Sequence, residues 1–505
     1  MLRLLSAAAL LGATRSASAA DAATVTLSSR EPVSEITPTY VSFNIDPSCN
    51  RGFHHTDFRN SNLAAAATAL APSVLRFGGS GADALVYGLS PGSPECASVS
   101  PVGCDYVTPG CLNATHWEGL HGLAVASGAD FLFGVSYDLP AACAAGETYS
   151  WNASNVKNLL DYLAARGESL WGFELGNEVN NNGGSPCNQT APQQAAALIE
   201  FSALLRARSP GARLVGPDTG GRYPETWLRA LLPLLPPGTL HAVTHHVYMG
   251  ATRTNFASPA FLDSSLPEIA WYTGLVPLAP GAEAWAGEDG PIGGGDDGSC
   301  GPDSVCGTYA STLWFADDMG QRARHGFRHY QRQDLFGGAY GLTDSATGAM
   351  ALSVDEPLML RPDFWTAFLW KRTLGTAVLA AASSSPTVRA WAFAGAPPSP
   401  FAEREDCGAL SLLLLNLENS SSTAVALPPP EAGGGAYAAW TLTAAGGDPF
   451  ARGAELNGAA LPLVVDQAHI DPSTFLQRIV QAPLRAPVAA GVVLPPLSTT
   501  FLCYA

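Results

Sequence analysis

The sequence has little positive charge. Its 505 residues include 26 Lys and Arg against 43 Asp and Glu, a formal net charge of −17. A field of this sign repels polyanions at long range. The balance excludes nucleic acid as an expected partner and disfavours a heavily sulfated polysaccharide as a ligand.

Long apolar runs are missing beyond the N-terminus. A bilayer-spanning helix needs about 20 consecutive apolar residues. The richest internal stretches, Leu228 to Leu235 and Leu410 to Leu415, are too short. We expect no integral membrane segment.

The first residues have the three parts of a secretory signal peptide: a basic start, an apolar run from Leu4 to Ala13, and small residues from Ala17 to Ala19. We expect residues 1–19 to be removed. The mature protein should be secreted or lie in the lumen of the secretory pathway, a lysosome or a vacuole. A contact with a membrane surface or a cell-wall glycan is left open.

Several motifs are absent as well. There is no CxxC pair, P-loop, dinucleotide fingerprint or HExxH, which argues against zinc, phosphate and NAD chemistry. We therefore expect no metal and no cofactor. The ten cysteines fit disulfides in a secreted chain, with Cys104/Cys111 and Cys300/Cys306 spaced as local loop staples. N-glycosylation sequons begin at Asn113, Asn152, Asn188 and Asn419.

Eight short apolar or β-branched runs lie between residues 40 and 338, and eight is the strand number of a (β/α)₈ barrel. They are Tyr40 to Asp46, Val74 to Gly79, Phe131 to Tyr137, Leu170 to Gly176, Leu214 to Pro217, Ala242 to Tyr248, Glu283 to Gly287 and Tyr330 to Gly337.

Helix-like segments separate most of these runs, with apolar residues at roughly 3.6-residue spacing over Asn155 to Ala165, Pro192 to Arg208 and Tyr309 to Arg324. Alternation of strand and helix predicts an α/β fold with a parallel sheet. We expect a (β/α)₈ TIM barrel over residues 40–376. A doubly wound open sheet is the alternative.

Beyond residue 376 the pattern changes to short strand-like stretches broken by Gly and Pro clusters, which is typical of an all-β unit. The stretches are Val388 to Ala394, Leu410 to Asn416, Tyr437 to Thr443 and Thr499 to Tyr504. We expect residues 377–505 to form a β-sandwich. The alternating stretch Ala23 to Ser29, within residues 20–39, would lend it an N-terminal strand.

Two glutamates, Glu178 and Glu288, follow or end predicted strands. Carboxyl ends of barrel strands carry catalytic residues. Glycoside hydrolysis needs a carboxylic acid and a second carboxylate across the scissile bond, about 5 to 5.5 Å apart when configuration is retained. A structural ion pair is the ordinary explanation for either Glu alone, but together, on the fourth and seventh runs of a secreted chain, they favour catalysis.

These features together resemble the heparanase and β-glucuronidase family of glycoside hydrolases, over about residues 40–376. The resemblance rests on motifs in the family's order: Leu75-Arg76-Phe77-Gly78-Gly79-Ser80, Phe173-Glu174-Leu175-Gly176-Asn177-Glu178, Thr244-His245-His246-Val247-Tyr248, Gly287-Glu288 before Gly293-Gly294-Gly295, Arg332-Gln333, Tyr340-Gly341-Leu342-Thr343-Asp344 and Pro362-Asp363-Phe364-Trp365.

The resemblance implies that Glu178 is the acid/base and Glu288 the nucleophile of a retaining enzyme. It also implies that Asp46, Asn177, Tyr248 and Gln333 contact the sugar. The carboxylate of glucuronic acid would be bound by Gly293, Gly294 and Tyr340, which we call the carboxylate clamp. Cys407 and Cys503 match the family's C-terminal disulfide.

The chain departs from heparanase in ways that affect the substrate. The stretch matching heparanase's Lys-rich patch, Gly110 to His116, has no Lys or Arg, and the interval between Glu288 and the glycines is one residue shorter. We therefore expect a secreted exo-β-glucuronidase whose partner is a carbohydrate bearing glucuronic acid. The alternatives are heparanase-like endo-cleavage of an acidic polysaccharide, another sugar specificity such as a xylosidase or arabinofuranosidase, and a catalytically silent carbohydrate-binding protein.

Overall fold

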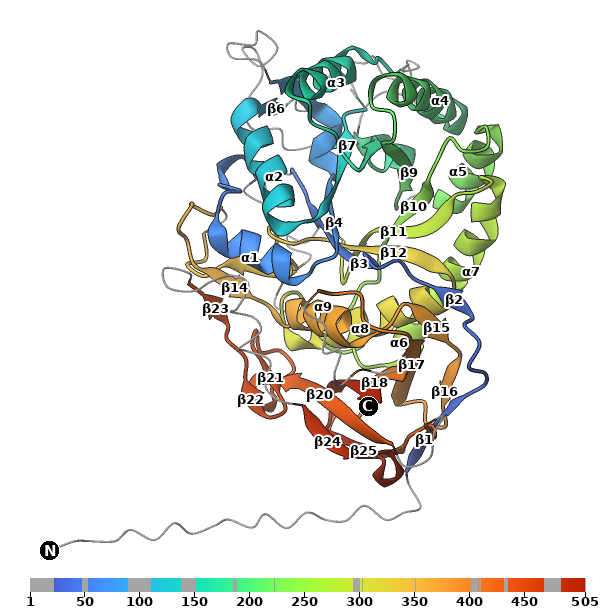
Figure 1. Ribbon diagram of the computed structural model, residues 1–505, viewed down its shortest axis with the longest axis vertical. Helices are drawn as coiled ribbons and strands as arrows, with labels where there is room; N and C mark the ends of the chain where they lie inside the picture. Colours follow the sequence, from blue (N-terminus) through green and yellow to red (C-terminus); the bar gives the residue numbers. More distant parts are fainter. Residues whose placement is uncertain are drawn as a thin grey trace, which may run out of the picture.

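The computed structural model describes residues 22–47, 53–89, 110–137, 151–184, 189–221, 223–293, 300–301, 303–349, 351–400, 407, 410–430, 435–466 and 483–504. The predicted signal peptide, Cys104, the sequon at Asn188 and Gly294 lie outside these residues. Figure 1 shows a barrel at one end of the molecule and β-sheets at the other.

Eight parallel strands close the barrel in chain order, and the last pairs with the first. This confirms the α/β barrel and excludes an open sheet. The strands are β3 (Val41–Ile45), β4 (Val74–Phe77), β7 (Asp130–Val135), β8 (Gly172–Leu175), β9 (Arg213–Thr219), β10 (Ala242–Tyr248), β11 (Glu283–Gly290) and β12 (Phe327–Arg332).

Helices cover the outside of the barrel (Figure 1). They are α1 (Ser61–Ala69), α2 (Ala114–Ser127), α3 (Ser154–Arg166), α4 (Ala191–Arg208), α5 (Pro224–Leu231), α6 (Pro259–Leu262), α7 (Leu266–Leu275), α8 (Tyr309–Arg324) and α9 (Pro362–Thr373). Two small sheets complete this half. One pairs β5 (Leu85–Gly88) with β6 (Gly110–Asn113), and the other contains β13 (Thr343–Ser345), β14 (Leu358–Leu360) and β23 (Val464–Val465).

The interior of the barrel changes character along its axis. At the amino ends of the strands an apolar cluster of Val74, Leu132, Val215, Ala242 and Trp285 fills it. Alternate residues of a strand share a face, so Arg76 and Glu174 also face inward, nearer the carboxyl ends. Both are fully buried. A charged layer therefore lies between the apolar plug and the barrel mouth.

Two further sheets form the other half. The four-stranded sheet runs β16 (Ala381–Ser383), β1 (Ala23–Leu27), β19 (Thr423–Ala426) and β25 (Val492–Leu494). The nine-stranded sheet contains β2 (Ser34–Glu35), β15 (Ala377–Leu379), β17 (Val388–Ala394), β18 (Leu410–Asn416), β26 (Ser498–Tyr504), β20 (Ala436–Ala444), β21 (Ala454–Leu456), β22 (Ala459–Ala460) and β24 (Leu484–Pro487). The N-terminal segment supplies β1 to the four-stranded sheet, while the division into domains and its boundaries stay predictions.

The nine-stranded sheet is buried on both faces, which explains the unbroken leucines of β18. Leu412 and Leu414 join the core shared with the four-stranded sheet. Leu413 and Leu415 join the main core that includes α8 and α9 residues. A strand covered on both sides reads as a continuous apolar run.

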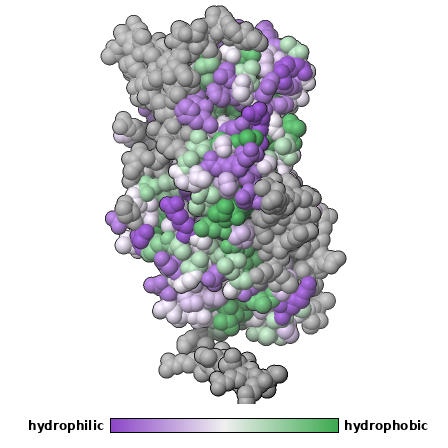
Figure 2. Space-filling view, turned by 90° about the vertical axis from the view of Figure 1, so that its left-hand side faces the viewer, coloured by the Kyte–Doolittle hydropathy of each residue, from purple (hydrophilic) through white to green (hydrophobic). Residues whose placement is uncertain are grey.

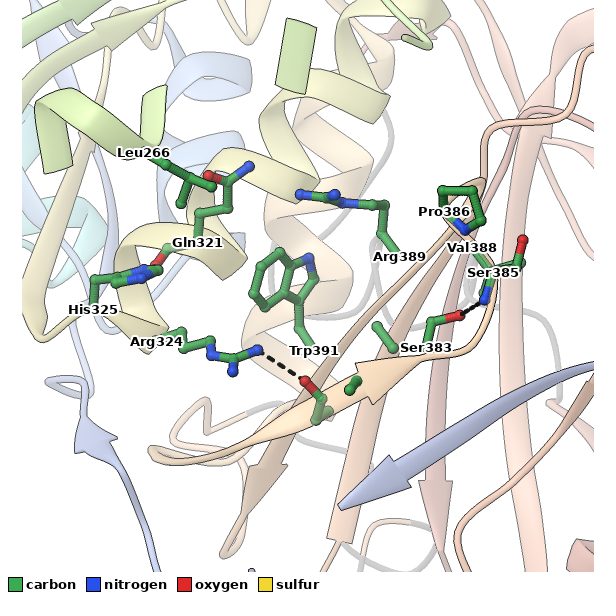
Figure 3. A pocket seen from close by; sticks show the side chains of 13 residues that line it. Leu266, Gln321, Arg324, His325, Ser383, Ser385, Pro386, Val388, Arg389 and Trp391 are labelled. Atoms are coloured by element: carbon green, nitrogen blue, oxygen red, sulfur yellow. Dashed lines mark hydrogen bonds between the residues drawn. The ribbon is translucent and has the colours of Figure 1, made fainter. Parts of the chain in front are cut away.

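The contact between α8 and β17 includes a side cavity of about 400 Å³ (Figure 3). Arg389 Nε and Trp391 Nε1 donate to Asp317 Oδ1 at 2.9 and 3.2 Å, and Arg324 donates to the Ala381 carbonyl at 2.8 Å. These bonds hold the barrel against the sheets. The described residues that line this cavity include no Asp or Glu, so they offer no carboxylate pair for glycoside hydrolysis.

Two predicted disulfides are confirmed, Cys300–Cys306 and Cys407–Cys503, with Cα atoms 5.6 and 4.7 Å apart. They are consistent with an extracellular or secretory-pathway protein. Among the described residues, no helix has the length and apolarity needed to cross a membrane. On the face shown in Figure 2, apolar areas are interspersed with polar ones.

Candidate active site

The two predicted catalytic glutamates meet at the barrel mouth. Glu288 lies in β11, and Glu178 lies three residues after β8. One side-chain oxygen of each, together with a ring nitrogen of His246, lies within 4.8 Å of the others. This limit on the distance between the nearest atoms is consistent with the roughly 5 to 5.5 Å between the carboxyl groups of retaining glycosidases.

His246 lies between the two carboxylates. Its Nδ1 is 3.1 Å from Glu178 Oε1 and 3.6 Å from Glu288 Oε2, and its Nε2 is 3.3 Å from Asp218 Oδ1. Burial alone would lower the pKa of His246, but the charge of Glu288 and the bonds to Asp218 and Glu178 outweigh it and raise the pKa to about 10. The ring is therefore an imidazolium at neutral pH.

Glu288 is held from two more directions. Tyr248 on β10 donates a short hydrogen bond to Oε1, and Arg76 Nη1 donates to Oε2 at 3.1 Å. Hydrogen bonds from a cation and a phenol favour the ionised carboxylate. This is the state that a nucleophile requires.

Arg76 also organises the groups around Glu288. Its guanidinium is fully buried and donates to Glu174 Oε2 at 2.6 Å and to Asn177 Oδ1 at 3.0 Å, and it lies 3.5 Å from Asp218 Oδ2. Because Asn177 accepts through Oδ1, its amide NH₂ remains to donate elsewhere. Arg76 thereby holds both Glu288, the predicted nucleophile, and the amide of Asn177, the predicted sugar contact.

The backbone conformation of Glu178 and the close approach of a neighbouring turn restrict the position of its side chain. Glu178 has a φ of +49°, a region that non-glycine residues rarely occupy, and its N–H donates to the Asp218 carbonyl at 2.8 Å. A Cβ on Gly220 would lie 2.2 Å from Glu178 Oε1. The turn after β9 must therefore carry glycine here so that the Glu178 carboxyl can approach it.

Most predicted site residues line one cavity of about 680 Å³, larger than the side cavity of Figure 3. The predicted residues among its lining are Asp46, Glu178, Tyr248, Glu288, Gly293 and Tyr340. Its lining among the described residues includes no Lys or Arg.

Two predicted residues, Gln333 and Asn177, are not among the residues that line this cavity. Gln333 is fully buried and donates from Nε2 to Asp46 Oδ2 at 3.1 Å, so it holds the carboxylate of Asp46 in position. Asn177, next to Glu178 in the chain, is 3% exposed. Gly294 lies outside the described residues, so the predicted clamp is described only at Gly293 and Tyr340.

Tyr340 is positioned by a buried ion pair. Arg332 Nη2 donates to the Tyr340 carbonyl at 2.9 Å and to Asp363 Oδ2 at 2.8 Å. The ring of Tyr340 lies 6.2 Å from that of Tyr248. Tyr248 and Tyr340 therefore lie close together in the lining of the cavity that also contains Glu288.

Glu178, His246 and Glu288 also form the one group among the described residues with the spacing of metal ligands. A ring nitrogen must be free of its proton to bind a metal. Because the pKa of His246 is raised to about 10, the trio fits a proton-holding network better than a metal site.

Sequence reasoning missed part of the charged layer under the pair. Arg76 and Glu174 appeared only as members of motifs, and Asp218 was not singled out. A signal was present: a charged residue inside an apolar strand of a parallel barrel is almost never left buried without a partner. Arg76 on the second run and Glu174 on the fourth could have been paired on that ground.

Residues 43–320, more than half of the chain, match the family model described as glycosyl hydrolase family 79, N-terminal domain. Heparanase-like protein 1 of Arabidopsis thaliana is 26% identical over 74% of this chain, and the match spans 66% of that protein, just under two thirds. Heparanase of Gallus gallus is 28% identical over 70% of this chain and 72% of its own length. Baicalin-beta-D-glucuronidase of Scutellaria baicalensis is 26% identical over 88% of this chain and 85% of its own.

Solved structures share the fold. A 4-O-alpha-L-rhamnosyl-beta-D-glucuronidase from Fusarium oxysporum aligns with a TM-score of 0.63 at 15% identity, covering 95% of this chain and 99% of that one. AbfB, a family 51 alpha-L-arabinofuranosidase from Bifidobacterium longum, aligns with a TM-score of 0.67 at 14% identity, covering 96% and 99%. The family match goes further than this likeness of fold: the chain belongs to glycosyl hydrolase family 79 and is a glycoside hydrolase.

Proposed function

We propose that this protein is a secreted exo-β-glucuronidase that works with retention of configuration, with Glu178 as acid/base and Glu288 as nucleophile. The observation that carries the mechanism is the approach of the two carboxylates to within 4.8 Å across His246. A water molecule held between two carboxylates, as inversion requires, needs a wider gap.

In the first step Glu178 donates its proton to the glycosidic oxygen while Glu288 attacks the anomeric carbon. The bond to the leaving group breaks, and a glycosyl ester of Glu288 forms. In the second step Glu178 takes a proton from water, and the resulting hydroxide displaces Glu288. While Glu288 is ionised, the protonated ring of His246 supplies positive charge between the two carboxylates.

The choice of a glucuronide over other sugars rests on relatives and on the cavity. Baicalin-beta-D-glucuronidase resembles the chain over most of both lengths. Backbone N–H groups at glycines approach an anion closely, and Gly293 and Tyr340 line the wall next to Glu288. We propose that Gly293, Gly294 and Tyr340 bind the sugar carboxylate, and that Asp46 and Asn177 bind its hydroxyls.

We favour exo-cleavage over heparanase-like endo-cleavage because the described lining of the cavity lacks Lys and Arg. Sulfated polysaccharides are bound through Lys and Arg. The lining of the cavity has neither among the described residues. A small acidic sugar with an uncharged leaving group fits this wall better than a polysulfated chain.

The test is a series of aryl β-glycosides that share a leaving group and differ only at C5: a carboxylate, a hydroxymethyl or a hydrogen. Hydrogen bonds to charged groups contribute about 1.5 to 3 kcal/mol each. Two such bonds predict a kcat/KM at least about 100-fold higher for the glucuronide than for the glucoside. Equal turnover would overturn the substrate class and leave the retaining mechanism standing, whereas no turnover of any member would favour a silent binding protein.

Tyr340→Phe should erode this preference while the slow glucoside reaction stays nearly unchanged. Tyr437→Phe is the matched control, because Tyr437 donates its hydroxyl to the Gly491 carbonyl in the β-sheet half, away from the cavity. A preference that survives Tyr340→Phe intact would remove Tyr340 from the clamp.

A further inference from the structure

The cavity extends past the catalytic pair. One wall includes Asp46 after β3, Tyr248 at the end of β10, Glu288 in β11 and Tyr340 after β12. The other wall comes from the turn after β9, the start of α5, β10 and α7, and its members are Gly221, Pro224, His245, Val247, Glu268 and Trp271. The proposed function uses the first wall and gives the second no task.

Glu178 marks the border between the two walls. The turn after β9 approaches it directly, since a Cβ on Gly220 would meet Glu178 Oε1. Gly221, next in the chain, lines the second wall and approaches Asn181, whose Nδ2 donates to Glu178 Oε2 at 2.8 Å. The group that receives a proton from Glu178 is the leaving group. The second wall therefore lies on the leaving-group side.

Among the described residues of this wall, Trp271 is the one large aromatic side chain, and neighbouring rings hold it in place. Its ring lies 5.2 Å from that of His245, and it meets Tyr272 edge-on at 6.0 Å. It is only partly buried. A fixed and partly exposed indole beside a cavity offers a flat apolar face for another ring.

The charges of the wall restrict what can bind there. Burial lowers the pKa of His245 to about 3, so this ring is neutral at physiological pH. Glu268 already faces Arg322 Nη2 at 3.3 Å. No described residue of the wall offers an unpaired positive charge to a sulfate or a second uronic acid.

From this geometry we infer that Gly221, Pro224, Val247 and Trp271 form a leaving-group subsite for an uncharged ring, with Trp271 as its platform. The ring belongs to an aryl aglycone or to a neutral sugar, which share an apolar face. The identity of the leaving group rests on the proposed function, whereas the subsite itself does not depend on which glycon occupies the first wall.

The test varies the leaving group on one glycon. Wild type and Trp271→Ala are compared on β-glucuronides of methanol, of 2-naphthol and of glucose. The variant should lose about three- to tenfold in kcat/KM on the substrates whose ring stacks, as expected for one aromatic contact. It should stay within twofold of wild type on the methyl glucuronide. Loss on naphthyl but not glucosyl substrate assigns the subsite to aryl aglycones, and the reverse to neutral sugars.

Trp171→Ala is the matched control, because Trp171 is also a partly buried tryptophan but stacks on Trp285 at the amino end of β8. Trp271→Phe keeps an aromatic face and should recover most of the loss, which covers the case in which Trp271→Ala folds poorly. Equal losses on all three leaving groups, or no loss, would overturn the subsite. If wild type cleaves no glucuronide, the proposed function fails, and the same leaving groups on the glycon that it does cleave test the subsite alone.

Discussion

At the scale of single residues, the site balances several carboxylates against two cations. Burial would raise the pKa of Asp218, but Arg76 and His246 outweigh burial and hold it well below its usual range. Arg76 and His246 each touch both Asp218 and Glu288. Removing one member of such a buried network leaves the others uncompensated. The catalytic geometry and the stability of the barrel mouth therefore depend on the same charges.

This coupling predicts a pH dependence of stability. The pKa of His246 is about 6.5 in the unfolded chain and is raised to about 10 in the folded protein. A raised pKa contributes stability that is fully present below about pH 6.5 and is lost as the pH rises toward 10. The melting temperature of wild type should therefore fall more steeply over this window than that of His246→Asn.

The exposed His325 gives the control variant, since it lies at the end of α8 beside the side cavity of Figure 3 and does not line the cavity that contains Glu178 and Glu288. His325→Asn should follow the wild-type curve. Parallel curves for wild type and His246→Asn would show that His246 is not the group that titrates.

At the scale of elements, the turn after β9 restricts the position of Glu178, the proposed acid/base. Asn180 Nδ2 donates to the Gly220 carbonyl at 2.6 Å, and the Gly220 N–H donates to Asn180 Oδ1 at 3.1 Å. The turn therefore cannot move away from an added methyl group. The Glu178 side chain must move instead.

Gly220→Ala should lower kcat by about 100-fold, the usual cost of misplacing a catalytic group by about 1 Å. Thermal unfolding and steady-state kinetics of the same preparation separate a local from a global effect. In Gly122→Ala the identical change on α2 meets no atom within 4 Å, so activity should be unchanged. Full activity of Gly220→Ala would mean that Glu178 is not the proton donor in this position.

Much of the barrel could be predicted from the sequence because strands buried on both faces read as apolar runs. The prediction was least accurate at β12, expected over Tyr330 to Gly337 and found over Phe327–Arg332. Its residues Arg328, His329 and Gln331 broke the apolar pattern. Polar side chains that are buried among partners carry no periodic signal, so neither this strand's limits nor the layer around Arg76 could be derived from hydropathy.

The site residues that could be predicted from the sequence are those that lie near the carboxyl ends of predicted strands. Glu288 and Tyr248 follow from β11 and β10, and the structure brings them together. Two features could not be predicted in this way: the burial of Gln333 against Asp46, and the second cavity wall that includes Trp271. Both depend on how the loops and α7 pack at the barrel rim. Such contacts are long-range and leave no local pattern in the sequence.

At the scale of the whole molecule, the disulfide Cys407–Cys503 ties the long C-terminal segment to the final strand β26. Its sequence separation is 96 residues, and the chain-entropy model gives loops of this size about 4 to 5 kcal/mol. Replacing both cysteines by Ala should lower the free energy of unfolding by that order in guanidinium titrations. Replacing Cys300 and Cys306, which are 6 residues apart, should cost less. Equal losses would contradict the loop-entropy reasoning.

Retention of configuration at a glucuronide is the central claim, because it joins the two glutamates to the substrate class. The most direct measurement follows the cleavage of an aryl β-glucuronide by proton NMR before the released sugar mutarotates. We expect the β-anomer of glucuronic acid to appear first, since two displacements through Glu288 restore the starting configuration. An α-anomer that appears first would contradict the assignment of Glu288 as nucleophile, and an aryl β-glucuronide left uncleaved would contradict the substrate.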